Sequence, residues 1–199
     1  MNVRANTGGT ADVVGLTKFA VPDPPNDPAR YVYPDVFEAS AEPPERLVIA
    51  PSANHVSLLF ELAGCWELKS FWLLYVLLVA RGDHEAGRYE SPHVLGSDDL
   101  RLFLARFQQF LEQDGRHALW IGSPAGEGTL VYDQHDVVFA YGPTDAYRQV
   151  LNRRGFAEQT FSYPDPHVHW YHAAFDPVED ELFAMWEWKQ SPLQEEDHY

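Results

Sequence analysis

The longest uninterrupted apolar run in the chain, residues 71–80, constrains the fold most. It shows neither the spacing of a helical stripe nor a period-two alternation, so both of its sides are expected to be covered. Its length and its aromatic and β-branched residues favour a central strand buried on both faces. A membrane span would need about 20 apolar residues. Lys69 and Glu67 lie just before the run and exclude that alternative.

Periodicity and capping residues predict a single α+β domain over residues 46–190. We expect a mixed or mostly antiparallel sheet of about five to six strands, with three to four helices packed on it. The strands are predicted at 46–50, 71–80, 118–121, 129–132, 137–141 and 157–163. The helices are predicted to cover 54–66, to begin at a Ser97 cap, to begin at Thr144, and to begin at a capping box over 176–179. Residues 54–66 could instead form a strand, because they contain the short apolar run 58–60.

The two ends differ in composition from this domain. Residues 1–45 hold seven of the fifteen prolines, which predicts an extended, partly disordered arm with a frayed start over residues 1–17. This arm either lies across the domain through its aromatic residues or becomes ordered on a partner. Residues 191–199 are polar and acidic and are expected to form a loose tail.

The charge balance bears on partners. With 30 acidic and 14 basic residues, the formal net charge is −16. That charge repels phosphate backbones and argues against nucleic-acid binding, whereas it suits either a basic protein partner or plain solubility. The single Cys65 cannot form an internal disulfide, and the chain begins without an apolar leader segment. We therefore expect a cytoplasmic protein of bacterial type that does not enter a membrane.

A His-x-His pair near the C-terminus is the clearest candidate for a metal site. In an extended chain His167 and His169 point to the same side, as two imidazole ligands of one divalent transition metal would. His172 lies on the opposite side unless the chain turns before it. The alternative is a partly exposed histidine-rich strand, or a loop after the prolines at 164 and 166.

A second candidate is the stretch around Asp133 and His135. A carboxylate beside an imidazole can orient and charge it for acid–base chemistry. The same residues also suit a hairpin turn, because aspartate side chains bond to nearby backbone groups. If His135 and Asp133 met His167 and His169 in space, the two stretches would form one site, with His135 as a further metal ligand.

Other sequence features give weaker indications of a functional site. Trp170, Tyr171 and Trp188 lie close to the histidines in sequence and are candidates for ligand or partner contacts, although core packing accounts for most aromatic residues. The glycine-bearing loop 123–128 lacks a phosphate-binding pattern, and familiar hydrolase, zinc-protease and redox motifs are missing.

Two function classes remain. The first is a non-catalytic interaction protein, for example an immunity-type or regulatory protein that binds a basic partner. The second is a metal-dependent enzyme or metal-binding protein that uses His167 and His169, with His135 or His172. No cofactor other than a divalent transition metal is expected.

Overall fold

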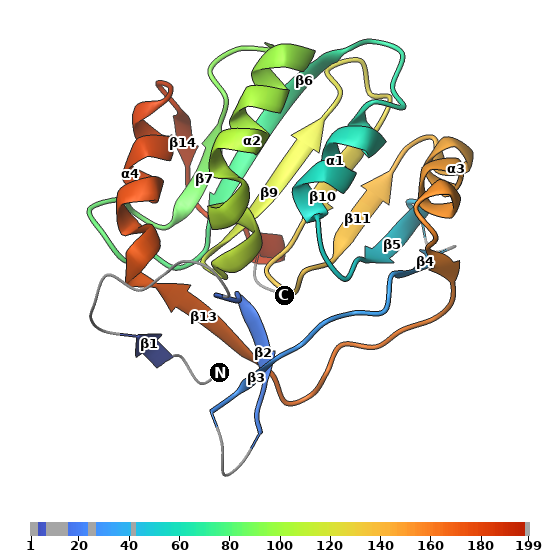
Figure 1. Cartoon of the computed structure of the whole chain (residues 1–199). Helices are drawn as coiled ribbons and strands as arrows, with labels where there is room; N and C mark the ends of the chain where they lie inside the picture. Colours follow the sequence, from blue (N-terminus) through green and yellow to red (C-terminus); the bar gives the residue numbers. More distant parts are fainter. Residues whose placement is uncertain (1–3, 7–15, 24–26, 41–42, 198–199) are drawn as a thin grey trace.

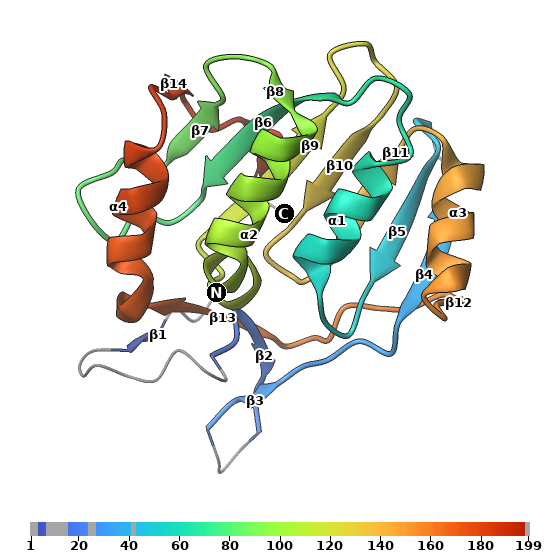
Figure 2. The ribbon, with the colours of Figure 1, turned by 45° about the horizontal axis from the view of Figure 1, so that its top comes forward.

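The computed structural model describes residues 4–6, 16–23, 27–40 and 43–197. Its main element is a ten-stranded mixed sheet, and the four α-helices all lie on one face of that sheet (Figures 1 and 2). A second sheet of four strands lies at one end of the first. The α+β class predicted from the sequence is confirmed, whereas the prediction of five to six strands was too low.

The large sheet is almost wholly antiparallel; only β12 and β4 pair in parallel. Several of its strands are only two to four residues long and leave no alternation to detect in the sequence. Its order is β12 (Ala157–Glu158), β4 (Val36–Ser40), β5 (Arg46–Ala50), β11 (Val138–Tyr141), β10 (Thr129–Tyr132), β9 (His117–Gly122), β6 (Ser70–Leu77), β7 (Gly87–Glu90) and β14 (Lys189–Ser191), with β8 (Leu95–Gly96) also pairing with β6.

The apolar run forms β6, an interior strand between β9 and β7. Phe71, Leu73 and Tyr75 are buried in the core beneath the helices. Leu74 and Val76 are also buried, although strand alternation turns them to the opposite face, which carries no α-helix. The strand ends at Leu77 rather than continuing to residue 80.

The helices are α1 (His55–Ala63), α2 (Ser97–Gln113), α3 (Thr144–Arg153) and α4 (Asp176–Ala184). The predicted helix over 54–66 is therefore confirmed. Two predicted caps are wrong. Gly96, not Ser97, is the N-cap of α2, and Phe175 is the N-cap of α4. The expected capping residue Glu179 instead turns into the interior and accepts a hydrogen bond from Arg116 at 3.2 Å.

No helix in the described part of the chain is both long and apolar enough to cross a membrane.

The second sheet joins the N-terminal and C-terminal parts of the chain. Its order is β1 (Arg4–Asn6), β13 (Val168–His172), β2 (Phe19–Val21) and β3 (Ala29–Arg30). The strand predicted over 157–163 is only Ala157–Glu158, because the chain then leaves β4 to reach this sheet. Residues 1–45 thus supply β1, β2, β3 and β4, and the predicted frayed start lies largely outside the described residues.

The C-terminal segment lies against the face of the large sheet that carries no helix. It contains a short 3-10 helix, η2 (Glu195–Asp197). The Asp197 carboxylate is buried and accepts a hydrogen bond from Arg88 at 2.7 Å. Asp197 also lines a small cavity with Val76 and Trp120. A tail expected to be loose therefore covers part of this face.

Candidate functional site

The loop between β10 and β11 is organised by one carboxylate. Oδ1 of Asp133 accepts hydrogen bonds from the backbone N–H of His135 at 2.9 Å and of Val137 at 3.0 Å. Oδ2 of Asp133 lies 2.8 Å from Nδ1 of His135. The stretch is thus a hairpin turn and an aspartate–histidine pair at once, because each carboxylate oxygen has its own partners.

Strand β13 brings two further histidines to this loop. His167 and His169 lie on the same side of the chain, and one ring nitrogen from each of them and from His135 lies within 4.8 Å of the others. The ring centroids are 4.8 Å apart for His135 and His169 and 5.1 Å apart for His135 and His167. Residues more than thirty positions apart in sequence therefore form one three-histidine cluster.

Hydrogen bonds orient two of these rings in the way typical of metal ligands. Nδ1 of His135 faces Asp133, and Nδ1 of His167 lies 3.0 Å from the Pro164 carbonyl oxygen. A metal-binding histidine usually donates its second N–H to such an acceptor, which fixes the tautomer and leaves Nε2 free. Nδ1 of His169 is buried and has no hydrogen-bond partner among the described residues.

The surroundings keep His169 neutral. Burial lowers the pKa of His169 to about 3, and the neighbouring His135 and His167 lower it further when they are charged. A neutral imidazole is the form that binds a metal, so no proton has to leave His169 at neutral pH. The buried Phe19 ring packs against all three histidines, with centroids 5.4–5.8 Å away.

His172, the fourth histidine considered, does not join the cluster. Its Nε2 lies 2.9 Å from the Thr17 carbonyl oxygen, and its backbone N–H donates to Asp114 at 2.8 Å. It points away because it lies three positions after His169, and in an extended strand an odd offset places two side chains on opposite faces.

The aromatic candidates also lie apart from the cluster. Tyr171 is buried, Trp170 is half-buried and stacks on His172, and Trp188 donates its indole N–H to the Leu182 carbonyl at 3.1 Å. None of the three lines the pocket described next. Their role in ligand or partner contacts stays a prediction.

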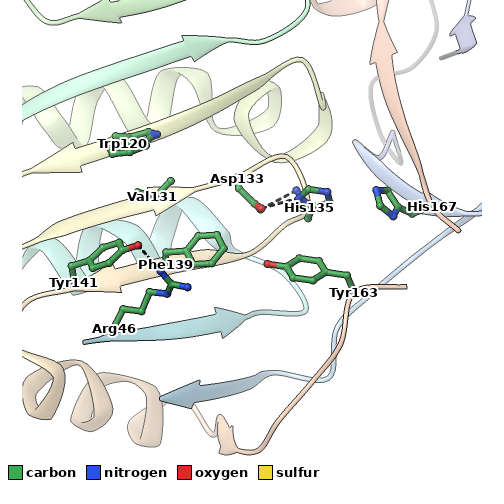
Figure 3. A pocket seen from close by; sticks show the side chains of 9 residues that line it. All are labelled: Arg46, Trp120, Val131, Asp133, His135, Phe139, Tyr141, Tyr163 and His167. Carbon is green, nitrogen blue, oxygen red and sulfur yellow. Dashed lines mark hydrogen bonds and ion pairs between the residues drawn. The ribbon is translucent and has the colours of Figure 1, made fainter. Parts of the chain in front are cut away.

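A pocket of about 470 Å³ opens beside the cluster on the helix-free face of the sheet (Figure 3). Trp120, Val131 and Phe139 form its floor, because they are direct cross-strand neighbours on β9, β10 and β11. The full lining is Arg46, Trp120, Val131, Asp133, His135, Phe139, Tyr141, Tyr163 and His167.

Sequence reasoning had identified three of these lining residues, Asp133, His135 and His167. It missed Arg46, Tyr163 and the aromatic floor. The sequence did hold one signal for this floor. Phe139 and Tyr141 are two positions apart on β11, so their side chains lie on the same side of the strand, opposite the core.

No family model matches the chain, and neither the curated proteins nor the solved structures include a match to it. The inferences below therefore rest on the geometry of this chain alone.

Buried histidines outside the cluster make the fold sensitive to acid. Burial lowers the pKa of His117 well below its usual value and also lowers that of His55. The unfolded chain then binds more protons than the folded chain below about pH 6.5, so stability falls as the pH falls. We expect each such histidine to cost about 1.4 kcal/mol of unfolding free energy per pH unit in that window.

Urea unfolding of the wild type and of His117→Phe at pH 7.5 and pH 5.5 tests this expectation. Phenylalanine suits the site, since the ring lies among Tyr75 and Phe110. The variant should lose less stability between the two pH values than the wild type. An equal loss in both proteins would show that His117 does not contribute.

Proposed function

We propose that the protein is a metal-dependent enzyme acting on a small molecule, with His135, His167 and His169 as the ligands of a divalent transition metal ion. The observation that carries this proposal is the convergence of three ring nitrogens within 4.8 Å. Three imidazoles satisfy part of the coordination shell of zinc, nickel or iron and leave positions open for water or substrate.

The outer partners support the proposal. A carboxylate behind His135 and a backbone carbonyl behind His167 hold these rings without using Nε2. Nδ1 of His169 is buried and makes no hydrogen bond of normal geometry with a described group, although the Gln134 backbone interacts with the ring. A poorly satisfied buried polar atom calls for an explanation. A bound cation would supply it.

The adjoining pocket favours catalysis over metal storage. Two of the three proposed ligands, His135 and His167, line it, so open coordination positions would face a half-open, mainly apolar space. Such a centre supplies a Lewis acid and a water molecule of lowered pKa. Its volume of about 470 Å³ suits a small molecule.

Metal analysis tests the proposal directly. The untagged protein, purified without chelator and then titrated with Zn²⁺ or Co²⁺, should bind about one ion per chain, and the ion should raise the melting temperature. Bound Co²⁺ should give a visible absorption band that reports nitrogen coordination. Less than 0.1 ion per chain at saturation, with an unchanged melting temperature, would refute it.

The net charge of −16 favours a second candidate, a non-catalytic protein that binds a basic partner. Charge complementarity of this kind accelerates association and weakens as salt rises. A pull-down from the native host at 50 mM and 500 mM salt distinguishes it: a basic protein recovered only at low salt supports this candidate, and an unchanged set of proteins at both salt concentrations opposes it.

A further inference from the structure

One basic side chain that lines the pocket, that of Arg46, has a hydrogen-bond donor without a partner. Arg46 lies at the start of β5, and its Nη1 donates to the Tyr141 hydroxyl at 3.1 Å. Its Nε is buried and has no hydrogen-bond partner among the described residues. Buried arginines are normally paired, since an unfilled N–H loses its contact with water without compensation.

Aromatic rings surround this guanidinium instead of carboxylates. Its central carbon lies 5.4 Å from the Phe139 ring and 5.8 Å from the Tyr141 ring. Such rings hold a planar guanidinium in place but accept none of its hydrogen bonds in the plane. The carboxylate closest in the sheet is that of Glu38, on the same side of the neighbouring strand β4 and opposite Val48, and it forms no ion pair with Arg46 in the described part of the chain.

Arg46 and the histidine cluster lie at opposite ends of one pocket. Figure 3 shows Arg46 and Tyr141 at one end and His135 and His167 at the other, with Phe139 between them and the Tyr163 ring alongside. A ligand that fills this space meets N–H donors at one end and the histidine cluster at the other. Its middle contacts almost only apolar and aromatic surface.

We propose that the pocket takes a small aromatic carboxylate, with its carboxylate on Arg46 and its reacting group at the histidine cluster. The part of this proposal that places the ligand's reacting group at the histidine cluster rests on the proposed metal-dependent function. The carboxylate class follows from Arg46, because a guanidinium matches the planar, two-oxygen geometry of that group. An aromatic body suits the floor of Trp120, Val131 and Phe139, which offers a flat ligand apolar and ring surface to pack against.

Binding of a matched probe pair tests the proposal. Naphthalene-2-carboxylate and the neutral naphthalene-2-carboxamide have nearly the same shape, and benzoate with benzamide provides a smaller pair. Affinities are measured by calorimetry and by quenching of tryptophan fluorescence, on the full chain with and without added Zn²⁺. We expect the wild type to bind each carboxylate at least tenfold more tightly than its amide.

Arg46→Met keeps the apolar stem and removes the charge, so it should abolish that preference while the amides still bind. Arg101→Met, at an exposed site on α2, is the matched control and should behave like the wild type. Equal affinity of the wild type for acid and amide, a preference that survives Arg46→Met, or no saturable binding of any probe to the folded protein would each overturn the proposal.

The His169→Ala variant separates this result from the metal question. The carboxylate preference depends on Arg46 and should persist in that variant and in chelator-treated wild type. If the wild type binds no metal but keeps the preference, the proposed metal-dependent function fails and the carboxylate site stands. If metal binds and the preference is missing, the carboxylate site fails alone.

Discussion

Replacing His169 with alanine should abolish stoichiometric metal binding. Loss of an outer partner of a metal ligand typically costs about 10–100-fold in affinity, and loss of a ligand itself should cost more than that. His169 is the most informative of the three, because it is buried and its Nδ1 has no other partner among the described residues. Competition between the protein and a chromophoric chelator gives the affinity.

Asp133→Asn tests the outer partner at the same centre. The asparagine oxygen can still accept the two backbone N–H groups that Oδ1 holds, so the hairpin should survive. Its amide nitrogen cannot accept the N–H of His135, and we expect an affinity about 10–100-fold lower.

His93→Ala is the matched control for both variants, because His93 is exposed and lies outside the cluster. It should bind metal like the wild type. Wild-type stoichiometry and affinity in the His169→Ala variant would rule out the three-histidine centre. Circular dichroism of each variant confirms that the fold is intact.

Replacing Asp114 with alanine should produce the largest loss of stability. Asp114 and Arg116 are fully buried, and the carboxylate accepts from Nε of Arg116 at 2.8 Å and from Nη2 at 3.0 Å. Removing the main partner of a buried ionic pair leaves its charge poorly compensated and costs up to about 3–5 kcal/mol. Arg116 keeps two partners, because its Nη1 also donates to Asp176 at 2.9 Å and to Glu179 at 3.2 Å.

The triple variant Asp114→Ala/Arg116→Met/Glu179→Gln serves as the control for that explanation. It removes the stranded charge together with both buried carboxylates that face it, so urea unfolding should show it to be more stable than Asp114→Ala alone. A single variant within about 1 kcal/mol of the wild type would mean that the pair contributes little.

The same pair also positions the site. Asp114 accepts the backbone N–H of His172, and Arg116 donates to the His172 carbonyl at 2.9 Å, so both backbone polar groups of this residue at the end of β13 are held. We therefore expect Asp114→Ala to weaken metal binding as well, through the displacement of the strand that carries His169.

Local patterns in the sequence predicted the parts of the fold that depend on neighbours in the chain. The stripe from Leu100 to Leu111 gave α2, and short connections gave the antiparallel pairing of β9, β10 and β11. The alternation of an extended strand placed His167 and His169 together and His172 apart. Each of these features depends only on residues that are close together in the sequence.

Features that depend on distant segments were not predictable in this way. The strand β4 lies inside the proline-rich arm and is recognisable only from its pairing with β5. Phe19, Arg46 and Tyr163 reach the site from three separate parts of the chain. Glu179 had the spacing of a capping residue, but the buried Arg116 draws it inward. In each case a tertiary contact outweighs a local preference.

The three proposed ligands come from both sheets: His135 follows a strand of the large one, whereas His167 and His169 belong to the segment of the small one. An ion held by all three would act as a removable cross-link between the N-terminal and C-terminal portions of the chain and the main body. Removal of the ion by a chelator should then destabilise the small sheet before the rest of the fold unfolds. Faster hydrogen exchange at the amides of β2 and β13 than in the large sheet would show this.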